Sequence, residues 1–86
     1  MSKKDKLLEK LLSRPTDFTW EEAIKVMRVH NFELVKRRGK SGGSRRVFRH
    51  ESGLKIFLHE PHPRNILQNY AIEHLISGLK DTGEIE

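Results

Sequence analysis

The chain has 86 residues, enough for one domain with a modest hydrophobic core and too few for two domains. Hydrophobic residues make up 35% and charged residues 34%, and 17 lysines and arginines against 12 aspartates and glutamates give a formal net charge of +5. The absence of cysteine excludes disulfide bonds and thiolate metal sites, and no apolar run approaches the ~20 residues of a membrane-spanning helix. With no signal-peptide pattern at its start, the chain is expected to be cytoplasmic, with no membrane partner.

The first predicted element is a helix over residues 3–13. Leucines at positions 7, 8, 11 and 12 form an apolar stripe at helical spacing, which indicates packing against the rest of the domain. Pro15 ends this helix, because the residue before a proline is disfavoured in the helical region.

A second helix is predicted from a capping box in which Thr19 is the N-cap and Glu22 is the third helical residue. Trp20 falls on the apolar face of this helix, so we expect it in the core rather than stacked on a base. The helix should end near His30 and Asn31.

Three strands are predicted next, over residues 32–37, 44–50 and 54–59, with Pro61 and Pro63 ending the sheet because proline cannot donate a ladder hydrogen bond. A final helix follows, capped by Asn65 or Asn69, and residues 81–86 form a polar tail that we expect to fray.

The predicted fold class is therefore α+β, in the order helix, helix, strand, strand, strand, helix. A three-stranded antiparallel sheet would have its helices packed on one face and water on the other. Residues 1–86 form one domain, with its core over 18–80 and the helix over 3–13 as an N-terminal addition.

Alternation along the strands predicts which side chains face the core. Leu54, Ile56 and Leu58 share one face of the third strand and must point inward, and Phe48 is the best core residue of the second strand. A three-residue connection over 51–53 then fixes the register. The expected pairs are His50–Leu54, Arg49–Lys55, Phe48–Ile56, Val47–Phe57 and Arg45–His59.

This register puts Arg45, Arg49, Lys55 and His59 on the outer face, around Val47 and Phe57. Seven lysines and arginines fall within residues 36–49 with no acid among them, the electrostatic pattern of a phosphate-binding surface, although a solvated basic face is the alternative. Arg49 and Lys55 oppose each other directly, and an anionic partner would relieve their repulsion. Phe57 could stack on a base, or be covered by a loop or a partner protein. The candidate RNA-binding residues are Arg37, Lys40, Ser44, Arg45, Arg46, Arg49, Lys55 and Phe57.

Two histidines have a spacing that a metal site could use. His59 and His62 lie three residues apart, but beyond Glu60 no neighbouring side chain completes a ligand set. We therefore expect no metal and no cofactor. His50 should point to the core side of the sheet in a structural role.

The stretch Gly42–His50 (GGSRRVFRH) resembles the HicA family of toxins. The order and spacing of further segments are also similar to that family: Asn31–Val35, Lys40–Ser44, Glu60–Pro63 and Tyr70–Leu79. The resemblance covers roughly residues 18–79. It implies a double-stranded-RNA-binding-like fold, an mRNA-cleaving activity and a HicB-like antitoxin as partner. The family pattern carries a catalytic histidine immediately after Gly-Ser, and Arg45 stands at that position here.

The leading hypothesis is a metal-independent endoribonuclease toxin (mRNA interferase). Because His59 lies opposite Arg45 in the expected register, it would take the place of the family's histidine, with Arg45 holding the phosphate. His62 would supply the acid. One alternative is a non-catalytic RNA-binding module with the same fold, and another is a DNA-binding helix pair within residues 7–27, which the position of the basic residues on the strands disfavours.

Overall fold

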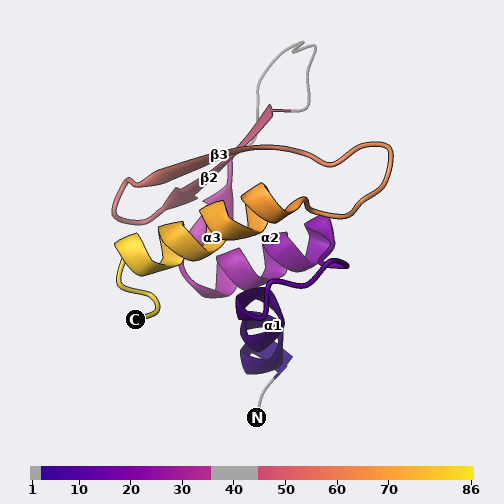
Figure 1. Cartoon of the computed structure of the whole chain (residues 1–86). Coiled ribbons are helices and arrows are strands. Elements are labelled where there is room, and N and C mark those ends of the chain that lie inside the picture. Colours follow the sequence, from indigo (N-terminus) through magenta and orange to yellow (C-terminus); the bar gives the residue numbers. More distant parts are fainter. Residues whose placement is uncertain (1–2, 36–44) are drawn as a thin grey trace.

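The computed structural model describes residues 3–35 and 45–86 of the chain. Two helices, α2 and α3, lie against one face of the sheet, and α1 packs on the side of these helices that is turned away from it (Figure 1). The predicted α+β class and the predicted order of elements are confirmed. The elements are α1 (Lys3–Leu12), α2 (Trp20–Val29), β1 (Phe32–Leu34), β2 (Arg45–His50), β3 (Lys55–His59) and α3 (Asn69–Asp81).

Helix α2 begins with the predicted capping box. The Glu22 backbone N–H donates to the Thr19 hydroxyl over 3.1 Å, and the Thr19 backbone N–H donates to the Glu22 carboxylate over 2.9 Å. Lys10 of α1 also donates to this carboxylate, at 3.0 and 3.2 Å from its two oxygens. Although burial works in the opposite direction, the hydrogen bonds from Thr19 and Lys10 hold the pKa of Glu22 below its usual value. The cap of α2 thereby also fastens α1 to the domain.

The end of α2 follows from one residue in the left-handed region. Asn31 has a φ of 66°, a conformation that asparagine tolerates better than most residues and that commonly ends a helix. The chain then turns directly into β1, in agreement with the predicted helix end.

The sheet is antiparallel with strand order β1-β2-β3. All the pairs predicted between the second and third strands are present: four form ladder partners, and the His50 backbone N–H donates to the Leu54 carbonyl over 2.8 Å. Strand β1 is shorter than predicted, although the Val35 N–H still donates to the Val47 carbonyl over 2.8 Å. Residues 36 and 37 of the predicted first strand lie outside the described residues.

The core lies between the sheet and the helices. Phe18, Phe32 and Phe48 are fully buried, and the Trp20 ring packs on Phe48 with its centroid 5.5 Å away, so Trp20 is a core residue as predicted. The leucine stripe of α1 also packs inward, with Leu11 fully buried. No helix in the described part of the chain is long and apolar enough to cross a membrane.

The start of α3 differs from the prediction. Its N-cap is Gln68, whose side chain makes no capping hydrogen bond, whereas Asn65 or Asn69 was expected to cap it. Asn65 instead accepts a hydrogen bond on its backbone carbonyl from the Trp20 N–H, and Asn69 is the first helical residue. The neighbouring Ile66 bridges to Thr19, so this loop is held by α2 before α3 begins.

The C-terminal tail is also different from the expected frayed end. Ile85 packs against the core, and its N–H donates to the Leu79 carbonyl over 3.3 Å. The Glu84 carboxylate lies 2.8 Å from His50 and 3.1 Å from the Asn31 amide. A buried histidine therefore anchors the tail, a contact between distant residues that local polarity does not reveal.

Candidate nucleic-acid interface and catalytic residues

The sheet face turned away from the helices is cationic. Arg45, Arg49 and Lys55 are exposed on it, as alternation predicts, and Phe57 is 50% exposed among them. A large exposed aromatic side chain beside cations is suited to the stacked bases and phosphates of single-stranded RNA. We call the group Arg45, Arg49, Lys55, Phe57 and His59 the outer face.

Part of the charge on the outer face is compensated within the chain. Glu33 on β1 is the register partner of Arg49, and their side chains form an ion pair of 2.7 Å. Arg49 and Lys55 were expected to need an external anion to relieve their repulsion, but Glu33 already provides a carboxylate to Arg49. Because both members of the pair are more than half exposed, the pair is weak and a phosphate can compete for Arg49.

Arg45 is a neighbour of both aromatic residues of the outer face, His59 and Phe57. It pairs directly with His59 across the strands, and its guanidinium carbon lies 5.1 Å from the centre of the Phe57 ring. A cation over an aromatic face is attracted by the ring. Arg45 can therefore offer a phosphate its donors while a base stacks beside Phe57.

Arg46 belongs to the other side of the sheet. It is half-buried, forms an ion pair of 3.0 Å with Glu60, and donates to the carbonyl of Arg45. Among the described residues, Arg46 therefore lies apart from the predicted RNA-binding residues Arg49, Lys55 and Phe57. Arg37, Lys40 and Ser44, also predicted to bind RNA, lie outside the described residues.

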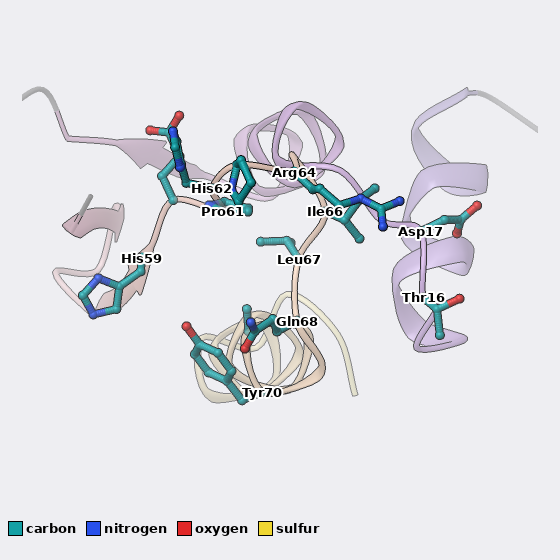
Figure 2. A pocket seen from close by; sticks show the side chains of 13 residues that line it. Thr16, Asp17, His59, Pro61, His62, Arg64, Ile66, Leu67, Gln68 and Tyr70 are labelled. Carbon is teal, nitrogen blue, oxygen red and sulfur yellow. The ribbon is translucent and has the colours of Figure 1, made fainter. Parts of the chain in front are cut away.

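A cavity of about 570 Å³ opens beside the outer face, where β3 ends. His59 and His62 both line it, together with the loop after them, the start of α3 and the segment before α2 (Figure 2). In Figure 2 the two imidazole rings do not point toward one another. His59 thus belongs to both surfaces, the outer face and the cavity.

Several cavity residues were not singled out from the sequence. Tyr70 is 45% exposed in the first turn of an amphipathic helix, and Gln68, Arg64 and Asp17 add polar groups to the same cavity. The only signal in the sequence was the position of Tyr70, off the apolar stripe of the last helix. The cavity forms where residues 16–17 fold against the stretch 59–71, so no local pattern predicts it.

The remaining histidines lie elsewhere. His50 is 5% exposed on the core side, as predicted, and His30 is held 3.6 Å from Glu84. Across residues 3–35 and 45–86, no group of three or more histidine, aspartate or glutamate side chains is arranged to hold a metal ion.

Comparison with known families adds a direct result. The family model described as HicA toxin of bacterial toxin-antitoxin matches residues 20–83, well over half of the chain. The chain belongs to the HicA toxin family. No curated protein and no solved structure gives a significant match. As a HicA toxin, the chain is the toxin component of a toxin–antitoxin system.

The HicA match starts at the first residue of α2, so α1 lies outside it. It includes the outer face and most of the cavity, which places both candidate surfaces within the HicA part of the chain. Arg45, which stands where the resemblance puts the HicA histidine, faces His59 in the sheet.

Proposed function

We propose that this HicA toxin binds single-stranded mRNA on the outer face and cleaves it as a metal-independent endoribonuclease, which arrests translation in the cytoplasm. The observation that carries the proposal is the direct pairing of Arg45 with His59, which lines a cavity together with His62. The pairing puts a phosphate-binding group and a proton-transfer group side by side on an exposed cationic surface.

In the proposed reaction, neutral His59 takes the proton from a ribose 2′-hydroxyl. The 2′-oxygen attacks the adjacent phosphorus, and the bond from phosphorus to the 5′-oxygen of the next nucleotide breaks. Protonated His62 gives its proton to that leaving oxygen, so the products carry a 2′,3′-cyclic phosphate and a 5′-hydroxyl. Arg45 stabilises the charge that develops on the phosphate oxygens. Base and acid act on opposite sides of the phosphorus, so the two imidazoles need not face each other.

The proposal is tested by cleavage of a labelled RNA by the full-length chain and by His59→Ala and His62→Ala. Each substitution should lower the cleavage rate by roughly 10²- to 10⁴-fold, the range of general acid–base catalysis. The matched control is His30→Gln, because His30 lies next to Asn31, at the end of the sheet opposite the Arg45–His59 pair. Cleavage should also persist in a chelator.

If a folded His59→Ala variant cuts RNA at the parental rate, His59 is not the base. Growth arrest on expression of each variant, with folding checked by circular dichroism, gives a second readout that does not depend on the RNA chosen.

A non-catalytic RNA-binding module remains the second candidate function. The stacking of Arg45 on Phe57 favours it, because this contact uses Arg45 for binding at the position where the HicA pattern has a histidine. This function requires that the parental chain binds RNA and never cleaves it, even when freed of its antitoxin.

We further propose that the antitoxin is a HicB-like acidic protein that covers the outer face. Phe57 offers an apolar anchor, and Arg49 and Lys55 surround it with positive charge. An exposed aromatic residue inside a charged rim is the usual centre of a protein interface. Binding there would block access of RNA to Arg45 and His59.

A further inference from the structure

The cavity at the end of β3 is larger than the two histidines need. Its volume of about 570 Å³ is in the range of sites that hold small organic ligands. Of the residues that line the cavity, the reaction proposed above uses only His59 and His62. The part of the lining formed by the start of α3 has no role in that reaction.

Tyr70 provides an aromatic surface on that part of the lining. It is 45% exposed, and its ring meets the His74 ring at 82° with the centroids 5.7 Å apart. This contact restricts the orientation of Tyr70 while leaving much of the side chain accessible. Planar groups with delocalised electrons stack on such a ring, and every nucleobase has a face of this kind.

Gln68 provides hydrogen-bonding groups beside the ring. It occupies the N-cap position of α3, but its side chain makes no capping hydrogen bond. Figure 2 shows the side chains of Gln68 and Tyr70 next to each other over α3, and both line the cavity together with His59. An amide both donates and accepts, as is needed to read the edge of a base.

Ile66 and Leu67 are apolar residues of the cavity lining that are held by contacts with the segment before α2. Leu67 is 4% exposed, and its backbone N–H donates to the Phe18 carbonyl over 2.8 Å, while Ile66 is bridged to Thr19. These contacts tie this part of the lining to Phe18 and Thr19, just before α2. The cavity thus combines a held apolar segment with several polar side chains, and a concave site with both can bind and orient an organic ligand.

We propose that this cavity binds one unstacked nucleobase of the RNA, stacked on Tyr70 and contacted along its edge by Gln68. The proposal rests on the proposed function and deepens it: the nucleotide next to the phosphate held at Arg45 and His59 enters the cavity. Sequence-specific recognition of RNA uses unstacked bases in this way, whereas phosphate contacts on the outer face carry no sequence information.

The test uses the four ribonucleoside monophosphates as probes, titrated into the full-length ¹⁵N-labelled chain and followed by amide chemical shifts. At least one of them should shift the amides of residues 66–71. Tyr70→Leu should weaken this binding roughly tenfold, the lower part of the range for loss of base stacking, and Tyr70→Phe should retain it. Gln68→Ala should change the order of affinity among the four bases.

Two controls separate this site from other sources of binding. Val29→Ala, at an exposed apolar position of α2 that belongs neither to the cavity nor to the outer face, should leave mononucleotide binding unchanged. Inorganic phosphate alone should not reproduce the shifts, and if it does, the cavity holds phosphate rather than a base and the proposal is wrong. The proposal is equally wrong if no mononucleotide shifts these amides, or if Tyr70→Leu, folded by circular dichroism, binds as the parent does.

These outcomes are distinct from those of the cleavage test. If the parental chain cleaves RNA but binds no mononucleotide in the cavity, the base site is rejected and the endoribonuclease proposal is unaffected. Mononucleotide binding in the cavity of a chain that cuts no RNA would support the base site and reject the catalytic proposal.

Discussion

His50 donates a hydrogen bond from Nε2 to the Glu84 carboxylate over 2.8 Å, and so joins the sheet to the third residue from the end of the chain. The backbone N–H of Ser52 donates to Nδ1 of the same ring over 3.0 Å. Because Nδ1 accepts this bond, the neutral imidazole carries its proton on Nε2. Glu84 therefore satisfies the buried donor of a histidine that is 5% exposed.

Removal of this carboxylate should destabilise the fold. Glu84→Ala leaves the His50 donor and the Asn31 amide without their acceptor, and we expect a loss of about 1–3 kcal/mol in the free energy of unfolding. Denaturant titration measures it. Glu86→Ala removes the same charge from an exposed position two residues away and should change stability by less than about 0.5 kcal/mol. Equal effects of the two substitutions would mean that the tail contact contributes nothing.

Stability should also depend on pH through Glu84. The hydrogen bonds from His50 and Asn31 hold the pKa of Glu84 below its usual value of 4.5. A carboxyl group whose pKa is lowered on folding stabilises the protein fully above its unfolded pKa, and this stabilisation is lost as the pH falls through the folded pKa. Between pH 6 and pH 3 the parental chain should lose more stability than Glu84→Gln, which has no group to titrate there. Parallel stability curves for the two chains would contradict this.

Gly78 allows α3 to approach β3 closely. A methyl group at this position would overlap Cδ1 of Ile56 and lie 3.0 Å from its Cγ1, and Ile56 is itself buried. Alanine favours a helix over glycine by about 1 kcal/mol, whereas overpacking a core costs about 1–3 kcal/mol. Gly78→Ala should therefore destabilise the chain by roughly 1 kcal/mol. Thermal unfolding of the variant and the parent measures this change. Ser77→Ala, at the exposed neighbouring position, should be neutral or slightly stabilising in the same measurement.

Glu33 should limit RNA binding by holding Arg49. Glu33→Gln releases the guanidinium from its 2.7 Å ion pair, so RNA affinity at low salt should rise about two- to fivefold, in line with the small energy of an exposed pair. Glu9→Gln makes the same charge change on exposed α1 and should have a smaller effect. Fluorescence anisotropy with a short single-stranded RNA measures both. If both variants gain equally, net charge alone explains the change.

The salt dependence of RNA binding should show how many phosphates are held. Contacts from Arg45, Arg49 and Lys55 predict a slope of about −2 for log affinity against log salt, at about −0.7 per contact on a single strand. Lys55→Gln should reduce the slope by about one contact. A flat response to salt would reject the outer face as the phosphate-binding surface.

The antitoxin interface should depend on the outer face. Arg49→Glu combined with Phe57→Ala should weaken the toxin–antitoxin complex at least about 30-fold, as expected when a central anchor of about 2 kcal/mol is lost. Lys6→Glu reverses a charge on exposed α1 and should have little effect in the same calorimetric titration. Equal losses would place the interface elsewhere.

Local patterns in the sequence were sufficient to predict the order of helices and strands and the register of β2 with β3. The capping box of Thr19 and Glu22 depends on residues three apart, and the face of each side chain in β2 and β3 follows from alternation. A register slip by one residue would have turned Phe48 out of the core, so burial of that side chain specified the pairing. The exposure of Phe57 and the inward position of His50 followed from the same alternation.

Contacts between distant residues were decided only by the tertiary structure. The contacts of Glu84 with His50, of Glu33 with Arg49 and of Glu60 with Arg46 form because the fold brings separate segments together. Along the sequence each of these side chains has several possible partners of opposite charge, and no local pattern selects one of them. The cavity is lined by residues 16–17 and by residues within 59–71, so Tyr70 and Gln68 come to line one cavity with His59 only after α3 has packed on the sheet. Apolar burial is strong and periodic enough to be predicted along the sequence, whereas polar pairs and cavities depend on the exact positions that this packing leaves.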